Sequence, residues 1–319
     1  MDEQEPNPHL IIPVGTQVVT LVDAKGRAGG RECPRGSVGE VCAAPQDNFH
    51  SYHVRFTDGT EAALRRHEFA VRKHHQAGEL LRPEEALADF RLYDCRIYVC
   101  VVGSRAYGLD HELSDVDRRG VYLAPAEMHW SLYGVPEQLE NKAGEECYWE
   151  LQKFLTLALK ANPNVLECLY TPLVERATPL ARELLGMRAA FLSKLVYQTY
   201  NGYVLSQFKK LEQDSRNRGA VRWKHAMHLV RLLLEGVGVL REGFLTVRVE
   251  EHRARLLAIR RGETPWEEVN AWRLALHKEF DAAYADTRLP ERPDYGRVNA
   301  FLVRARRASA EQGGKAYEV

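Results

Sequence analysis

The sequence predicts an α/β protein that combines a small all-β domain, an α/β domain and a helical domain. Three observations support this prediction. Short strand-like runs separated by turn residues occupy the N-terminal part of the chain. An apolar, β-branched run at residues 97–102 ends in Gly103-Ser104, which indicates a strand followed by a tight turn. From about residue 177 onward, apolar residues recur every three or four positions, which is the period of packed helices.

The composition is that of an ordinary globular protein: of the 319 residues, 45% are hydrophobic and 28% are charged. Lys and Arg together number 44, as do Asp and Glu, so any contact with a polynucleotide requires a local basic patch. The six cysteines form no CxxC pair and lie mostly in apolar runs, which predicts reduced core residues. No apolar stretch approaches the roughly 18 residues that span a bilayer. No signal peptide opens the chain, so we expect a cytoplasmic protein without a membrane partner.

The N-terminal part predicts a disordered tail, residues 1–10, and then an all-β domain, residues 11–75. The strand-like runs lie at residues 17–22, 37–43, 52–56 and 60–64. Turn residues separate them, and Asp58-Gly59 is the clearest hairpin turn. The pattern resembles the SH3-like barrels that occur as accessory modules in bacterial proteins. Such a barrel implies either a docking module for RNA or a peptide, or a module that packs on the neighbouring domain, and we favour the second.

The segment at residues 99–122, VCVVGSRAYGLDHELSDVDRRGVY, holds the main functional motif. About ten residues after the Gly103-Ser104 turn, Asp115 and Asp117 precede a second apolar run. The side-chain period of a strand is two, so we expect both aspartates on one face and Val116 in the core. Two carboxylates on one face repel each other unless a cation lies between them, and their oxygens suit Mg²⁺ or Mn²⁺.

The turn and the two aspartates together predict nucleotidyl transfer. A turn without bulky side chains lets backbone N–H groups and the Ser104 hydroxyl approach a triphosphate beside the metal site. A D-x-D motif alone is more often an Asp-rich turn, but the order of strand, Gly-Ser, helix and D-x-D strand is far more specific. This order resembles the motif of the DNA polymerase β nucleotidyltransferase superfamily.

The resemblance covers residues from about 80 to 319. Within the superfamily they resemble predicted nucleotidyltransferases of bacteria and phages that are grouped with the RNA-repair, RNA-ligase-associated polymerase family. The matching stretches are GSRAYGLDHELSDVDRRG, YWELQKFLTLALKANPNVLECLY, GYVLSQFKKL, KHAMHLVRLL, IRRGETPWEEV and LPERPDYGRVN. The resemblance implies a catalytic α/β domain with a mixed sheet at residues 80–175, beside a helical bundle at residues 176–308. The polar residues 309–319 predict a mobile tail.

The superfamily resemblance also implies a third carboxylate on a neighbouring strand. The family pattern of an acidic residue shortly before the EL and KF pairs selects Glu145, whereas strand alternation leaves Glu146 open. Related sequences more often have Asp here, so the glutamate departs from the pattern. By the two-metal template, Asp115 and Asp117 hold one cation on the nucleotide phosphates. A second cation, shared by Asp117 and Glu145, activates the acceptor hydroxyl. Pyrophosphate then leaves, stabilised by the metal, Ser104 and Arg105.

Helices supply further candidates for nucleotide binding. They are predicted at residues 79–92, 179–188, 189–213, 222–242, 249–261 and 265–285, with a loop near the site at 124–141. Residues 151–169 predict a helix that ends at Asn162-Pro163-Asn164 and a short helix after it. The nucleotide-binding candidates are Gly103, Ser104, Arg105, Lys153, Tyr203, Gln207, Lys210, Lys224, His228 and Arg231. Tyr203, Gln207 and Lys210 share one helix face. Lys224, His228 and Arg231 either line the nucleotide cleft or satisfy buried polar groups. Basic clusters such as Arg260-Arg261 either track a phosphate backbone or form an ordinary helix surface.

The sequence therefore predicts an enzyme that moves a nucleoside monophosphate from an NTP to an acceptor hydroxyl, with an RNA 3′ end as the first acceptor. Three alternatives stay open: a catalytically silent RNA-binding or antitoxin-like scaffold, a protein AMP-transferase and a ribonuclease. The last rests on the stretch from Arg222 to His228, in which an Arg a few residues before a His resembles the ribonuclease motif of HEPN domains. The intact Gly-Ser turn and both aspartates argue against a silent scaffold. The oligomeric state is not predicted.

Overall fold

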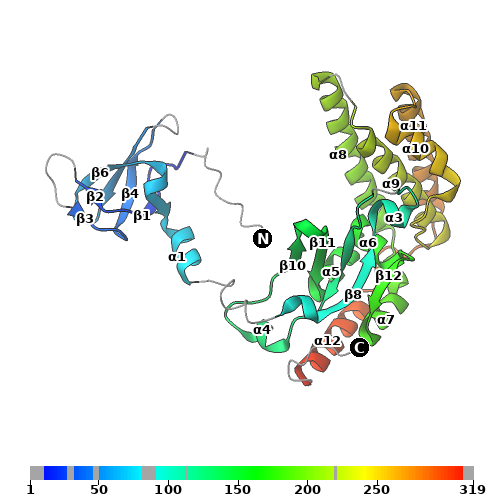
Figure 1. Cartoon of the computed structure of the whole chain (residues 1–319), viewed down its shortest axis with the longest axis horizontal. Coiled ribbons are helices and arrows are strands. Elements are labelled where there is room, and N and C mark those ends of the chain that lie inside the picture. The colour runs from blue at the N-terminus through cyan, green and yellow to red at the C-terminus, as the bar shows by residue number, and fades with distance from the viewer. Residues whose placement is uncertain are drawn as a thin grey trace. The chain divides into compact units, whose positions relative to one another are not determined.

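A computed structural model describes residues 11–26, 32–45, 50–80, 91–111, 114–218 and 221–311. Within these ranges, the side chains of residues 77–80, 142, 210, 212 and 214–218 are not described. The chain divides into two compact units, Met1–Asp89 and Phe90–Val319 (Figure 1). The predicted N-terminal tail lies outside the described residues.

The N-terminal unit contains a five-stranded antiparallel sheet in the order β6-β5-β4-β1-β7. Its strands are β1 (Gln17–Thr20), β4 (Val38–Ala43), β5 (Tyr52–Phe56), β6 (Glu61–Leu64) and β7 (Phe69–Val71). A two-stranded sheet of β2 (Ala24–Lys25) and β3 (Glu32–Cys33) and the helix α1 (Arg72–Leu80) complete it. Alternation along β5 buries Tyr52, Val54 and Phe56 in one core. The four predicted strands and the hairpin turn at Asp58-Gly59, where Gly59 has a φ of +86°, are confirmed.

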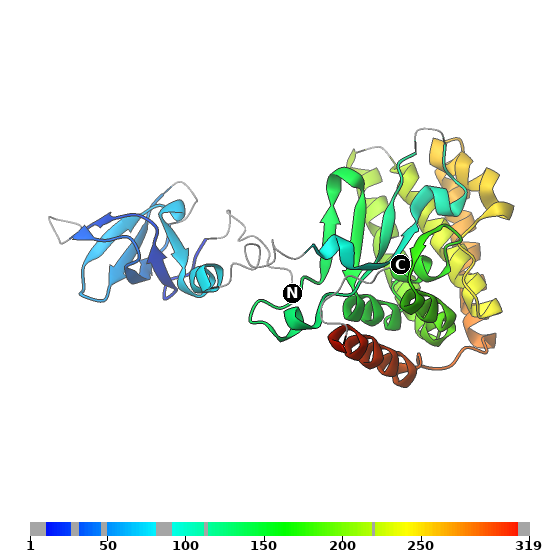
Figure 2. The same cartoon turned by 60° about the horizontal axis from the view of Figure 1, so that its bottom comes forward.

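The C-terminal unit is built on a five-stranded mixed sheet in the order β10-β11-β9-β8-β12. Its strands are β8 (Arg96–Val101), β9 (Arg118–Tyr122), β10 (Gln138–Asn141), β11 (Glu146–Glu150) and β12 (Val174–Ala177). The central strand β9 pairs antiparallel with β8 and parallel with β11. Figure 2 shows these strands, coloured cyan to green, beside the helices that follow them. The predicted strand at residues 97–102 and the mixed sheet are present.

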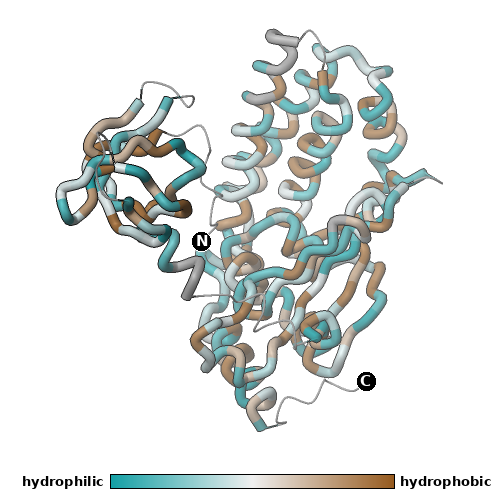
Figure 3. Tube along the Cα trace, turned by 60° about the vertical axis from the view of Figure 1, so that its left-hand side comes forward, coloured by the Kyte–Doolittle hydropathy of each residue, from teal (hydrophilic) through white to brown (hydrophobic). Residues whose placement is uncertain are grey.

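Helices cover the sheet and continue into a bundle. They are α3 (Gly103–Tyr107), α4 (Ala126–Trp130), α5 (Leu151–Leu159), α6 (Pro163–Tyr170), α7 (Pro179–Gly186), α8 (Leu195–Arg218), α9 (Trp223–Glu242), α10 (Arg253–Arg261), α11 (Trp266–Asp286) and α12 (Tyr295–Glu311). Local sequence sets several starts: the Asn162 side chain accepts a hydrogen bond from Val165 N, and Pro163 occupies the first turn of α6. Hydrophobic and hydrophilic residues alternate along these helices (Figure 3). In the described part of the chain, no helix is long and apolar enough to cross a membrane.

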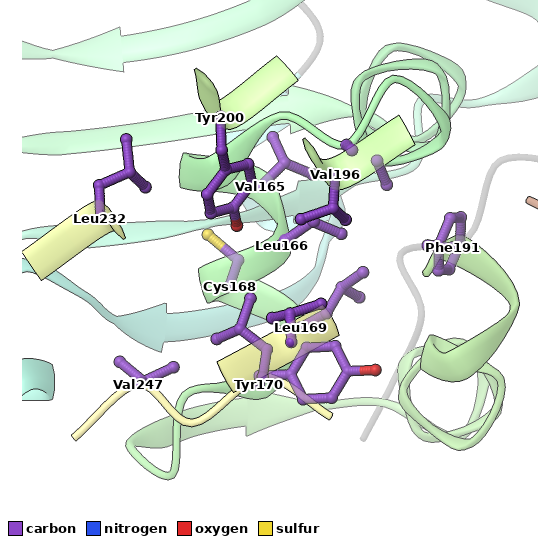
Figure 4. Close-up of a cluster of buried hydrophobic side chains, with 14 of the residues drawn as sticks. Val165, Leu166, Cys168, Leu169, Tyr170, Phe191, Val196, Tyr200, Leu232 and Val247 are labelled. Carbon is purple, nitrogen blue, oxygen red and sulfur yellow. The ribbon is translucent and has the colours of Figure 1, made fainter. Parts of the chain in front are cut away.

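One hydrophobic core joins the sheet to the helices. The helix α6 lies at its centre, where Val165, Leu166 and Cys168 pack against residues of α8 and α9 (Figure 4). Sheet residues such as Val121 belong to the same core. The predicted boundary near residue 176 therefore does not separate two compact units.

Two predictions need correction, and a third lies mostly outside the described residues. The segment at residues 124–141 contains the helix α4 and the edge strand β10, so it is not one long loop. The helix α12 ends only at Glu311 and buries Ser309, whose hydroxyl donates to the Ala124 carbonyl oxygen, so the predicted tail begins later than residue 309. The predicted helix at 79–92 lies mostly outside the described residues, and Leu92–Cys95 form a 3-10 turn.

Candidate active site

A small pocket brings the Gly-Ser turn together with α9 and α10. It is lined by Gly103, Ser104, Tyr107, Leu109, Asp117, Lys224, Met227, His228 and Arg260 and has a volume of about 70 Å³. The three helices involved, α3, α9 and α10, lie next to one another (Figure 1). Five predicted site residues, Gly103, Ser104, Asp117, Lys224 and His228, therefore meet at one place.

The wall formed by the turn depends on a glycine. Gly103 directly precedes Ser104 at the start of α3 and has a φ of +70°, a backbone conformation that favours glycine. A Cβ atom at this position would lie 2.4 Å from Oδ2 of Asp117, which is closer than the two atoms can approach. The Val102 N–H donates to the Asp117 carbonyl oxygen over 3.0 Å. The carboxylate of Asp117 thus lies directly against the turn.

The two aspartates differ in their surroundings. Asp117 lines the pocket with its side chain one-third exposed, and its Oδ1 lies 3.5 Å from Nη2 of Arg119. Asp115 is exposed and lies outside the pocket lining, and its carbonyl oxygen accepts a hydrogen bond from Nε of Arg105. Both aspartates precede β9, which begins at Arg118, so regular alternation does not extend to them. The expectation that Val116 lies in the core is accordingly wrong, since its side chain is only half-buried.

Glu145 directly precedes β11, as Asp117 directly precedes β9. The parallel register pairs Arg118 with Glu146, so Asp117 and Glu145 each directly precede a paired residue. The guanidinium of Arg119 joins the two segments, because its Nη1 donates to the Glu145 carbonyl oxygen over 2.7 Å while Nη2 faces Asp117. Glu145 itself is exposed, with a left-handed φ of +51°. Among the described residues, no three His, Cys, Asp or Glu side chains lie close enough together to hold a metal ion.

Glu146, the alternative third carboxylate, lies beside a different set of side chains. Burial first and the Glu146 carboxylate second raise the pKa of Tyr93. The Tyr93 ring packs edge to face on Tyr148, at 6.0 Å between centroids. Neither tyrosine lines the pocket.

The opposite wall carries basic and polar groups from α9 and α10. Lys224 is exposed, while His228 is partly buried and packs its ring edge to face on Tyr107. Burial, with the nearby charge of Arg231 second, lowers the pKa of His228 to about 4, so its imidazole is neutral at pH 7. Arg260 donates from Nη1 to the Leu109 carbonyl oxygen over 2.8 Å. The sequence placed Arg260 only in a basic cluster, because no spacing relates a residue of α10 to the Gly-Ser turn.

Arg231 does not line the pocket. It satisfies buried polar groups instead, which is the alternative role considered for it. We call Tyr107, Glu167, Tyr200, Arg231 and Glu235 the Arg231 cluster. The guanidinium of Arg231 is buried. It donates hydrogen bonds to Glu167 over 2.6 Å and to Glu235 over 2.7 Å, and it lies 3.8 Å from the centre of the Tyr107 ring. Tyr107 and Tyr200 donate their hydroxyls to Glu167 and Glu235 respectively. Burial, with the Glu167 charge second, raises the pKa of Glu235 to about 8.

The remaining nucleotide-binding candidates lie outside the pocket lining or outside the description. Lys153 on α5 pairs with Glu137. Tyr203 on α8 is exposed, and Oε1 of Gln207 lies 3.1 Å from a ring nitrogen of His225. Arg105 holds the segment before β9 through hydrogen bonds to the carbonyl oxygens of residues 114 and 115. The side chain of Lys210 is not described.

Comparison with known families identifies the family of the chain. The sequence profile of RlaP, described as the RNA repair pathway DNA polymerase beta family, matches residues 73–304. The chain belongs to this family. The matched residues of this RNA-repair family include the Gly-Ser turn, both aspartates and the wall from α9 and α10. The predicted resemblance to polymerase β-like nucleotidyltransferases of RNA repair is confirmed.

One curated relative shares a shorter stretch. The uncharacterized protein YcgL of Bacillus subtilis (strain 168) is 33% identical over 81 residues, which are 24% of this chain and 31% of the relative. The matched part of the chain thus spans less than a third of that protein. No solved structure matches the chain significantly.

Proposed function

We propose that this protein transfers a nucleoside monophosphate from an NTP to an acceptor hydroxyl, with an RNA 3′ end as the first acceptor. One observation carries the proposal: the Asp117 carboxylate lies against the Gly103-Ser104 turn, in a pocket whose other wall carries Lys224 and Arg260. A carboxylate opposite two cationic side chains suits a metal-bound phosphate chain, because each group finds a partner of opposite charge. The membership in the RNA-repair family supports the choice of acceptor.

Each residue of the pocket has its own role in the proposed nucleotide binding. At Gly103 the missing side chain lets the Asp117 carboxylate lie against the turn, and the Ser104 hydroxyl donates to the phosphate oxygens beside it. Lys224 adds a positive charge that stabilises the pyrophosphate as it leaves. The neutral imidazole of His228 offers a hydrogen bond without adding charge. Arg119 holds the segments of Asp117 and Glu145 at a fixed separation.

Of the predicted ligands Asp115, Asp117 and Glu145, which do not come together as a closed set among the described residues, Asp117 would hold the divalent cation, Mg²⁺ or Mn²⁺, beside the substrate phosphates. The donor set fits, because magnesium is usually bound through one or two carboxylates together with substrate phosphates, and a closed cage of protein ligands is not required. Asp117 meets this condition where it faces the pocket. Bound metal supplies charge stabilisation at the phosphates and lowers the pKa of the acceptor hydroxyl.

We also propose that the N-terminal unit is an SH3-like accessory module. The order of its strands, β6-β5-β4-β1-β7, supports this proposal. The strands β4, β5 and β6 pair with one another in sequence order, and the last strand, β7, pairs with the first, β1.

The transfer reaction is tested with each NTP labelled at the α-phosphate, incubated with Mg²⁺ or Mn²⁺ and a mixture of RNA and cell extract. We expect label in the RNA fraction, lost in Asp117→Asn and kept in Asp94→Asn, which removes an exposed carboxylate outside the pocket. Label in the protein fraction would show that the acceptor is a protein and not RNA. RNA cleavage or no transfer at all would contradict the proposal.

A further inference from the structure

The size of the pocket limits what enters it. Small-molecule sites usually enclose roughly 300 Å³ or more, whereas this pocket holds about 70 Å³. A whole nucleotide does not fit in that volume, so the base and ribose remain outside it. The fragment inside must be small and compact.

The charges of the lining select an anionic fragment. Lys224 and Arg260 carry two positive charges, Asp117 carries one negative charge, and His228 is neutral at pH 7. A phosphate chain satisfies both cations and brings a metal ion to the carboxylate. A neutral or cationic fragment would leave the net positive charge of the lining uncompensated.

Arg260 is the better oriented of the two cations. Its Nη1 donates to the Leu109 carbonyl oxygen over 2.8 Å, and its Nη2 lies 3.3 Å from Nε2 of His111. These contacts use two of the five N–H groups of a guanidinium, which leaves others for a ligand. A guanidinium held in one orientation loses little side-chain entropy when it binds a phosphate, and its planar fork can bind two oxygens at once.

We propose that Arg260 is a phosphate-binding residue of this site and that it grips the pyrophosphate end of the nucleotide. The inference rests on the proposed function for the identity of the ligand, but binding itself does not require transfer. Because the pocket encloses only phosphate groups, Arg260 acts equally on nucleotides of every base. Residues outside the pocket must then select the base of the nucleotide.

Two neighbouring arginines provide matched controls. Arg253 also anchors the segment after α3, through a 2.7 Å hydrogen bond from Nε to the Gly108 carbonyl oxygen, but it does not line the pocket. Arg261 adjoins Arg260 in sequence, yet it is more than half exposed and forms two hydrogen bonds with Glu263. A change at Arg253 tests whether loss of support for the segment after α3 alone weakens ligand binding. A change at Arg261 tests the effect of losing one positive charge nearby.

The test is calorimetric titration of the full chain with inorganic pyrophosphate in Mg²⁺ buffer. Arg260→Gln is expected to weaken binding at least tenfold, while Arg253→Gln and Arg261→Gln stay within about threefold of wild type. Arg260→Lys keeps the charge without the planar fork, so it should lie between wild type and Arg260→Gln. Thermal unfolding of each variant verifies the fold, and Arg260→Lys serves alone if Arg260→Gln does not fold.

Three results would overturn the assignment. The first is unchanged pyrophosphate binding in Arg260→Gln. If only Arg260→Lys folds, unchanged pyrophosphate binding in that variant has the same meaning. Equal losses in Arg253→Gln and Arg260→Gln would show that Arg260 merely supports the segment after α3. A loss confined to one of the four NTPs in a parallel titration would show that it reads the base. Pyrophosphate binding through Arg260 in a protein that transfers no nucleotide would leave the assignment standing and reject the proposed function.

Discussion

The pocket and the Arg231 cluster are neighbouring sites built from the same kinds of side chain, and they use them differently. Each has an arginine from the helices and a carboxylate from a segment of the sheet or α6, and Tyr107 contributes to both. In the cluster, Arg231 is buried and both carboxylates accept its hydrogen bonds. In the pocket, Asp117 and Arg260 remain partly exposed on separate walls. The comparison indicates that the cluster stabilises the fold, whereas the pocket keeps its charges for a ligand.

The largest expected effect is on stability in the cluster. Arg231→Gln leaves the buried carboxylate of Glu167 without its cation and removes a hydrogen-bond donor from Glu235, which should lower the free energy of unfolding by about 3–5 kcal/mol. Arg260→Gln removes hydrogen bonds of a partly exposed group and should cost about 1 kcal/mol. Urea unfolding at pH 7 measures both. Equal losses in the two variants would remove the distinction between the sites.

A pH series sharpens the same comparison. Burial raises the pKa of Glu235 to about 8 from an ordinary value near 4.5, so between these pH values the folded protein holds a proton that the unfolded chain has released. Stability due to this group is therefore present below pH 4.5 and is lost as pH rises toward 8, by up to about 1.4 kcal/mol per pH unit. Glu235→Gln should remove that slope, so its stability should improve relative to wild type between pH 6.5 and 8. A constant difference between the two proteins over this range would contradict the assignment.

A smaller effect is expected at the turn. Gly103→Ala adds a Cβ that collides with the Asp117 carboxylate, while Gly134→Ala at a similar positive φ meets no atom within 4 Å. Both variants should lose about 1–2 kcal/mol of stability from backbone strain. Only Gly103→Ala should weaken binding of Mg²⁺ and nucleotide, by about tenfold or more. Equal nucleotide binding in the two variants would show that contact between the turn and Asp117 is not needed.

The parts of the site that were predictable lie close together in the sequence. Strand β8, the Gly-Ser turn and Asp117 form one continuous segment, so local patterns identify them. The roles of His228 and Arg231 were not separable, because they lie on one helix within a turn and the partner Glu167 comes from a distant helix. The side-chain alternation assumed for Asp115 and Val116 failed because β9 begins only at Arg118. Arg260 was missed as a pocket residue because tertiary packing alone brings α10 to the turn.

The most direct test of the account is Mn²⁺ binding in the presence of a non-hydrolysable NTP analogue, followed by electron paramagnetic resonance. This measurement needs no knowledge of the acceptor. Wild type and Asp94→Asn should bind Mn²⁺ together with the nucleotide, whereas Asp117→Asn should bind it at least tenfold more weakly. Undiminished Mn²⁺ and nucleotide binding in Asp117→Asn would contradict the claim that this pocket is the nucleotidyltransferase site.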